Sequence, residues 1–149
     1  MKTFLIILLF FMSSCGFQPI YLNKNLNNFE FLKIDLIGDD FINNKIINSS
    51  LLKENNNANN LFTINISSSY AVREISKNQK GQAETYRSTV MVDLKIFDKE
   101  NLIKNKIFSE ETTFNKNDNK FDLSQNQIKI KNQLIDRVIE NIIIFLNTE

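Results

Sequence analysis

Cys15 is the residue whose type and position most directly predict a chemical event. The chain starts with one basic residue, Lys2, continues with an apolar run over residues 4–12, and reaches Cys15 through two serines. This order is typical of a bacterial lipoprotein signal, in which the chain is cut before the cysteine and the cysteine receives lipid. We therefore expect residues 1–14 to be a signal peptide and Cys15 to be the lipid-attachment residue.

Three other interpretations of this segment compete with a lipoprotein signal. A transmembrane anchor needs about 20 apolar residues, more than the run over residues 4–12 supplies. An ordinary signal peptide cut near Ser14 would leave an exported protein with an unpaired thiol. A buried structural cysteine needs a folded element around it, and the sequence predicts none before Cys15. The lipoprotein signal is favoured, and it predicts a lipidated tether over residues 15–28.

The second group of candidate residues lies on a predicted hairpin. Two segments carry apolar residues at even positions: Phe62, Ile64, Ile66, Tyr70 and Val72, then Tyr86, Val90, Val92, Leu94 and Ile96. Period two is typical of half-buried antiparallel strands. Because both strands bury their even-numbered positions, each even-numbered residue must pair with an even-numbered residue of the other strand. A three-residue loop over 79–81 with Gly81 in the left-handed conformation meets this condition. A tighter loop would instead place Arg73 opposite Thr85.

The three-residue loop places Arg73 directly opposite Arg87 on the outward face. Like charges in such a pair normally destabilise a sheet, and an anionic partner over this face would relieve the repulsion. We therefore name Arg73, Arg87 and the neighbouring Lys77 and Lys80 as candidate anion-binding residues. The residues alone favour the alternative, a solvated pair whose charge is offset by two neighbours, Glu74 and Glu84.

The composition excludes several classes of function. The chain has 18 basic and 17 acidic residues, so it lacks the basic excess of a nucleic-acid-binding protein. It has no histidine and one cysteine, which excludes histidine acid–base catalysis and the usual zinc sites. No paired-carboxylate site, glycine-rich phosphate loop or nucleophile constellation is present. We predict that the protein is not an enzyme and needs no metal or cofactor.

The remainder of the chain has the size and pattern of a single domain over residues 29–149. Alternation over Phe29 to Ile37 predicts a first strand, and near-helical spacing over Phe41 to Glu54 predicts a helix. A further strand is expected from Leu102 to Phe114. The cleaner apolar face of the first strand is formed by Glu30, Leu32, Ile34 and Leu36.

A second helix is expected near the C-terminus. Ser124 and Gln127 fit a capping box at its start. Its apolar end, over residues 142–146, is expected to pack against the sheet, which we favour over a membrane or partner contact. The order strand-helix-strand-strand-strand-helix predicts an α+β fold: a four-stranded antiparallel or mixed sheet with two helices packed on one face.

The segment after the lipoprotein signal resembles a known family. The residues Cys15-Gly16-Phe17-Gln18-Pro19-Ile20-Tyr21 resemble the opening of mature LPS-assembly lipoproteins of the LptE family, and the order of predicted elements over 29–147 is also similar. The resemblance implies an outer-membrane lipoprotein on the periplasmic face that plugs the large β-barrel LptD. Together the two proteins deliver lipopolysaccharide to the outer leaflet, and the lipoprotein is not an enzyme.

The resemblance also implies partners: an LptD-type barrel, lipopolysaccharide, and the membrane through the N-terminal lipid, with no nucleic acid. The family's lipid-binding basic residues have no clear counterpart here, so Arg73, Lys77, Lys80 and Arg87 are predicted from the hairpin alone. Two alternatives are an accessory lipoprotein of another envelope lipid-transport system and a periplasmic scaffold that binds no ligand. A lipoprotein enzyme would need a catalytic constellation that the sequence does not supply.

Overall fold

The structure is a computed structural model that describes residues 29–49, 52–56 and 62–147. The predicted signal peptide, Cys15 and the tether over 15–28 lie outside the described residues. Within the described ranges, no helix is long and apolar enough to cross a membrane.

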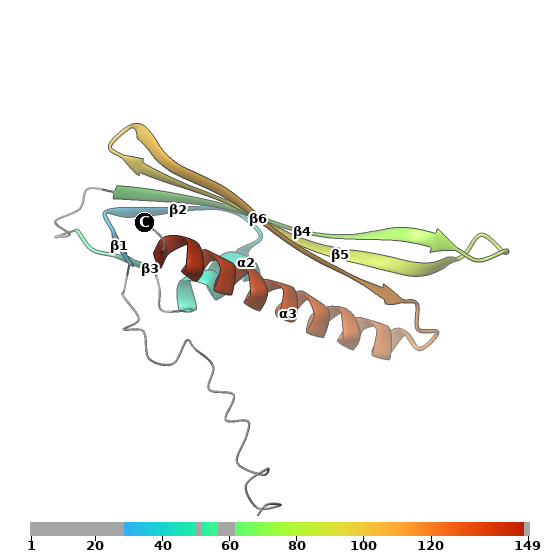
Figure 1. The fold of residues 1–149 in the computed structure, drawn as a ribbon. Coiled ribbons are helices and arrows are strands. Elements are labelled where there is room, and N and C mark those ends of the chain that lie inside the picture. Colours follow the sequence, from blue (N-terminus) through green and yellow to red (C-terminus); the bar gives the residue numbers. More distant parts are fainter. Residues whose placement is uncertain (1–28, 50–51, 57–61, 148–149) are drawn as a thin grey trace, which may run out of the picture.

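The central element is a four-stranded mixed sheet in the order β2-β4-β5-β6 (Figure 1). The short edge strand β2 (Lys33–Gly38) pairs in parallel with β4 (Phe62–Lys77). The strands β4, β5 (Ala83–Asp98) and β6 (Asn101–Asn115) form an antiparallel meander. The two long strands predicted from alternation and the expected fourth strand are therefore confirmed.

Among the described residues, two helices cover one face of this sheet and none covers the other (Figure 1). The short helix α2 (Asp40–Asn48) contacts β2 and β4, and the long helix α3 (Lys120–Asn147) contacts β5 and β6. This arrangement confirms the predicted α+β fold with both helices on one face.

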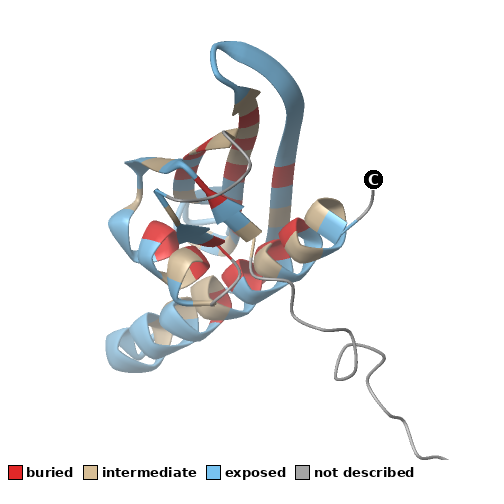
Figure 2. Ribbon diagram, turned by 90° about the vertical axis from the view of Figure 1, so that its left-hand side faces the viewer, coloured by how far each residue is buried: buried red, intermediate tan, exposed pale blue. Residues whose placement is uncertain are grey.

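The core lies between α3 and the even positions of the long strands. Ile64 and Ile66 of β4 and Val90, Val92 and Leu94 of β5 have no exposed surface. They face the apolar stripe of α3, which is formed by Leu134, Ile135, Val138 and Ile142. Figure 2 shows these buried positions as bands on the strands and on the inner side of the helix. Burial of this apolar area is the main stabilising contribution to the fold.

The predicted first strand is wrong as a single element. It is divided into β1 (Phe29–Phe31) and β2, and β1 pairs in parallel with β3 (Leu52–Glu54) in a separate two-stranded sheet. The predicted apolar face is also wrong in part: Phe31 is buried, whereas Leu32 and Leu36 are exposed. Leu32 lies between the two strands, and Leu36 lies on β2, an edge strand whose apolar side chains reach only the margin of the core.

The predicted helix over 41–54 is correct only as far as Asn48. Its end is fixed by Ser49, whose hydroxyl donates to the Ile46 carbonyl. Leu52, which the helical spacing includes, is instead buried in β3 beside β1. A partner strand about 20 residues earlier in the chain thus overrides the local helical pattern.

The capping box predicted at Ser124 and Gln127 is wrong, because α3 begins at Lys120. The side-chain oxygen of Asn119 accepts a hydrogen bond from the Phe121 backbone N–H at 3.0 Å, as an N-terminal cap does. The other end of α3 packs against the sheet for the most part as predicted: Ile142 is buried, and the Phe145 ring lies edge-on to Phe108, with 5.7 Å between ring centroids, whereas Ile144 is 41% exposed.

Candidate anion-binding site on the long hairpin

The long hairpin formed by β4 and β5 carries the predicted basic residues. Its register places Arg73 directly opposite Arg87. Gly81 has a φ of +76°, and the Asn78 backbone N–H donates to the Gln82 carbonyl at 2.8 Å, which closes a loop over residues 79–81. The predicted register and three-residue loop are therefore confirmed.

Both arginines lie on the sheet face opposite α2 and α3. Side chains alternate along a strand, so Tyr70 and Ser88 lie on the opposite face to Arg73 and Arg87. The Tyr70 hydroxyl and the fully buried Ser88 hydroxyl are 3.1 Å apart on that inner face. Arg73 and Arg87 are both exposed and therefore accessible to a ligand from solvent.

The charges around the two arginines differ. The Arg87 guanidinium is 3.5 Å from a Glu111 carboxylate oxygen on β6. Glu74 lies 3.8 Å from the Lys77 amine, so it forms its ion pair with a lysine. Among the residues that the structure describes, the Arg73 side chain has no ion-pair or hydrogen-bond partner. Arg73 is therefore the cation of the pair that a ligand could bind without first displacing a carboxylate.

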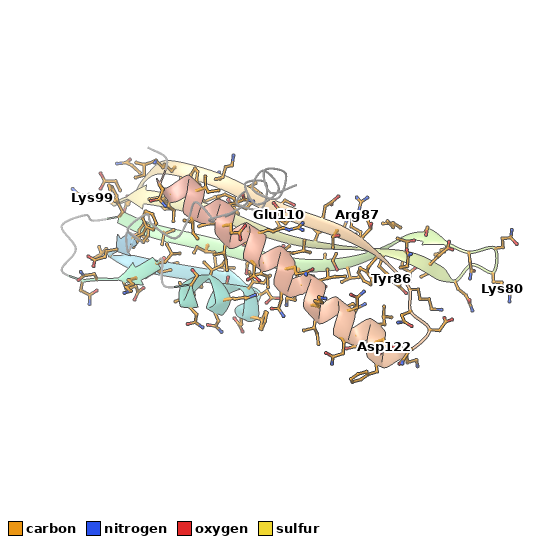
Figure 3. The ribbon with its side chains drawn as sticks, turned by 60° about the horizontal axis from the view of Figure 1, so that its bottom comes forward. Lys80, Tyr86, Arg87, Lys99, Glu110 and Asp122 are labelled. Carbon is orange, nitrogen blue, oxygen red and sulfur yellow. The ribbon has the colours of Figure 1, made fainter. Side chains whose placement is uncertain are left out.

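The two lysines lie farther along the same hairpin. A register shift between Glu74 and Ser76 separates the arginine pair from Lys77, which pairs with Ala83. Lys80 lies at the tip, where its backbone N–H donates to the Asn78 side chain at 2.9 Å. Figure 3 shows Lys80 at the end of the hairpin and Arg87 farther back on the sheet. The structure thus brings the arginines together and spaces the lysines outward from them.

The chemistry of this arrangement is suited to phosphate groups. A guanidinium donates two parallel hydrogen bonds to a phosphate, and the bond is strengthened by charge. Arg87 also lies opposite Thr113 of β6, a further hydroxyl donor on the same face. Sequence reasoning missed Glu111 and Thr113, because the alternation of the β6 segment is unclear and its register could not be set.

Lys131 of α3, a cation outside the hairpin, forms an ion pair with Asp39. Its amine lies 2.9 Å from an Asp39 carboxylate oxygen and over the rings of Tyr70 and Phe41, at 4.8 and 5.0 Å from their centroids. Burial of Asp39 by itself would raise its pKa, but hydrogen bonds from Lys131 and from the Ile42 backbone N–H outweigh this and hold the pKa below its ordinary value. Lys131 therefore links α3 to the start of α2.

Comparison with known proteins defines the fold. No family model matches the sequence, and no curated protein matches it. The solved minor lipoprotein from Acinetobacter baumannii is similar, with a TM-score of 0.52 and 16% identity over 74% of this chain and 87% of that chain. Lipoprotein B from Nitrosomonas europaea has a TM-score of 0.53 and 11% identity over 74% of this chain and 79% of that chain.

A lipoprotein from Caulobacter crescentus is similar to the same degree, with a TM-score of 0.51 and 11% identity over 76% of this chain and 86% of that chain. At such identities the similarity establishes the fold. The chain therefore has a fold that is found in bacterial lipoproteins.

Proposed function

We propose that this protein is an outer-membrane lipoprotein, anchored by lipid on Cys15 at the periplasmic face, that supports an LptD-type β-barrel in delivering lipopolysaccharide. Two independent observations support the proposal. The sequence from Cys15 to Tyr21 resembles the opening of LptE-family proteins. The described domain has a fold that occurs in solved bacterial lipoproteins.

The observation that carries the ligand assignment is the arginine pair on the open sheet face. Arg73 and Arg87 face each other, which is unfavourable for like charges, and Glu111 offsets only the charge of Arg87. Lipopolysaccharide carries phosphate groups, which guanidinium groups bind well. The odd-numbered residues of β4 lie on the same open face as Arg73, and most of them are polar. A polar face suits the water-filled interior of an outer-membrane barrel. In this role the protein binds and positions its partners and catalyses no reaction.

The partner assignment is tested by purification from membranes. A C-terminally tagged full-length protein is extracted in mild detergent, and the co-purifying proteins are identified by mass spectrometry. We expect a large outer-membrane β-barrel in stoichiometric amount. Recovery of an inner-membrane transporter instead would favour the accessory-lipoprotein alternative, and recovery of no partner would favour a scaffold.

The lipid assignment is tested at Cys15. Cells that express the wild-type chain are labelled with radioactive palmitate, beside cells that express Cys15→Ser. We expect label on the wild-type protein only, and an accumulated precursor in the variant. Label on both proteins, or on neither, would contradict lipidation at Cys15.

A further inference from the structure

The turn between β5 and β6 forms a second surface at the other end of the sheet. Residues 98–107, named here the β5–β6 tip, are all exposed. Figure 3 shows Lys99 of this tip and Lys80 of the long hairpin at opposite ends of the molecule. In Figure 2 the tip and the first half of β6 form a continuous exposed stretch.

The β5–β6 tip exposes large apolar side chains that the fold does not need there. Leu102 is 52% exposed, Ile103 47% and Ile107 56%. The register shifts after Ile96, which pairs with Lys104, so that Ile103 has no partner in the pairing with β5. Such a bulge turns side chains out of the sheet. Adjacent exposed Leu and Ile at a hairpin tip point to a contact with an apolar environment.

Lysines flank these apolar side chains. The tip contains Lys99, Lys104 and Lys106 against two acidic residues, Asp98 and Glu100. The Lys104 amine lies 5.9 Å from the centre of the Phe145 ring, which holds this lysine beside the end of α3. Long basic side chains next to apolar ones are suited to a membrane surface, because their stems stay with the apolar groups while their amines reach lipid phosphates.

The β5–β6 tip lies at the end of the domain where the described chain begins. The Leu32 backbone N–H donates to the Phe62 carbonyl at 2.8 Å, and Phe62 pairs with Asp98. At about 5 Å per strand, Leu32 is therefore about 10 Å from the strand that carries Asp98. Figure 1 shows β1 and the β5–β6 turn at the same end.

The chain between Cys15 and this end is long enough to reach a common membrane surface. The domain begins at Phe29, 14 residues after Cys15. An extended chain of this length spans at most about 50 Å. A lipid on Cys15 can therefore lie in the same leaflet that the tip contacts.

We propose that the β5–β6 tip docks on the phospholipid surface of the membrane that holds the lipid of Cys15. Leu102 and Ile103 enter the boundary between headgroups and acyl chains, and Lys99 and Lys106 lie among the lipid phosphates. This contact fixes the orientation of the domain and directs the long hairpin away from that surface. This proposal rests on lipid anchoring at Cys15, and the membrane contact needs neither the barrel nor lipopolysaccharide.

The test uses the mature chain with Cys15→Ser, so that no covalent lipid contributes. Co-sedimentation is measured with vesicles of phosphatidylethanolamine and phosphatidylglycerol, and with vesicles of phosphatidylcholine alone. We expect binding to the anionic vesicles and a loss of about tenfold in affinity for Leu102→Glu with Ile103→Glu, because two apolar contacts are replaced by repelled charges. Lys99→Gln with Lys106→Gln should weaken binding to the anionic vesicles only.

The matched control is Phe121→Glu with Ile128→Glu, which also replaces two exposed apolar residues, 68% and 53% exposed, on α3. Figure 3 shows the start of α3, marked by Asp122, at the opposite end from Lys99. The control should bind as the parent does. Absence of vesicle binding by the parent would overturn the proposal. An equal loss of binding in the Leu102→Glu, Ile103→Glu variant and in the Phe121→Glu, Ile128→Glu control would also overturn it. Leu102→Asn with Ile103→Asn, and circular dichroism of each variant, separate a lost contact from a lost fold. Since no lipopolysaccharide or barrel is present, either outcome leaves the proposed function unaffected.

Discussion

Arg73 and Arg87 face each other across the β4–β5 ladder, on the sheet face that neither helix covers. Among the described residues, Arg87 alone of the two has a carboxylate at ion-pair distance, at 3.5 Å in Glu111. The pair therefore keeps one positive charge that no carboxylate of the described residues offsets at ion-pair distance. Because like charges in a facing pair are unfavourable, the ligand proposal rests on this relationship.

Arg73→Glu should separate stability from ligand binding. The change breaks no ion pair of the described residues and places opposite charges in a facing pair, so the free energy of unfolding should stay equal or rise by about 0.2–1 kcal/mol. Affinity for lipopolysaccharide should fall about tenfold, because a guanidinium–phosphate contact is replaced by repulsion. Urea unfolding and equilibrium binding of fluorescent lipopolysaccharide measure the two quantities.

The control for that experiment is Arg137→Glu, which makes the same charge change at an exposed position of α3. It should leave lipopolysaccharide affinity within twofold of wild type, a range expected for a remote surface charge. Equal losses in the two variants would show that net charge alone drives binding and would remove the special role of the arginine pair.

Gly38 should tolerate no side chain. It has a φ of +101°, and a Cβ at this position would overlap the Ser68 carbonyl oxygen, to which the Asp39 backbone N–H donates. Gly38→Ala should therefore lower the free energy of unfolding by at least about 2 kcal/mol. Gly81→Ala is the control: its φ is +76° but its Cβ would meet open space, so the cost should be about 1 kcal/mol. Equal costs in urea unfolding would refute the steric explanation.

Asp39 should make stability depend on pH. Its pKa is lower in the folded protein than in the unfolded chain, so its contribution is complete above the unfolded pKa of about 3.9 and is lost as the pH falls through the folded value. Asp39→Asn should be less stable than wild type at pH 7, and the difference should shrink below about pH 4. Asp40→Asn, one residue later in the first turn of α2, is the control and should cost less stability at pH 7 than Asp39→Asn. A gap for Asp39→Asn that stays constant from pH 7 to pH 3 would contradict the ion pair with Lys131.

The core assignment of α3 predicts unequal costs along one helix. Ile135 has no exposed surface, whereas Ile128 is 53% exposed. Ile135→Ala should lower the free energy of unfolding by about 2–5 kcal/mol, since it leaves a cavity against the sheet. Ile128→Ala should change it by less than about 0.5 kcal/mol. Similar midpoints and slopes for the two variants in urea would indicate a different face of α3 in the core.

The long strands could be predicted from sequence because their signal is local and strict. Apolar residues at even positions, together with one glycine able to adopt positive φ, determine both the faces and the register that joins Arg73 to Arg87. The segment around Leu52 could not be predicted in this way. Its helical spacing is overridden by pairing with β1, a contact between distant parts of the chain.

The start of α3 could not be predicted for a different reason. Its first turn shows little apolar periodicity in the sequence, and the structure leaves the Phe121 side chain there 68% exposed. The capping residue Asn119 follows two other asparagines, Asn115 and Asn117, and the sequence does not distinguish which of them caps the helix. Within the candidate site, the positions of Glu111 and Thr113 depend on the β5–β6 register, which only the structure sets.

The most direct test of the central claim is depletion of the protein in the bacterium that produces it, with lipopolysaccharide on intact cells measured by an antibody to its surface part. We expect surface lipopolysaccharide to fall while total lipopolysaccharide persists, and the wild-type gene supplied in trans to restore it. Unchanged surface lipopolysaccharide after depletion would contradict the proposed function.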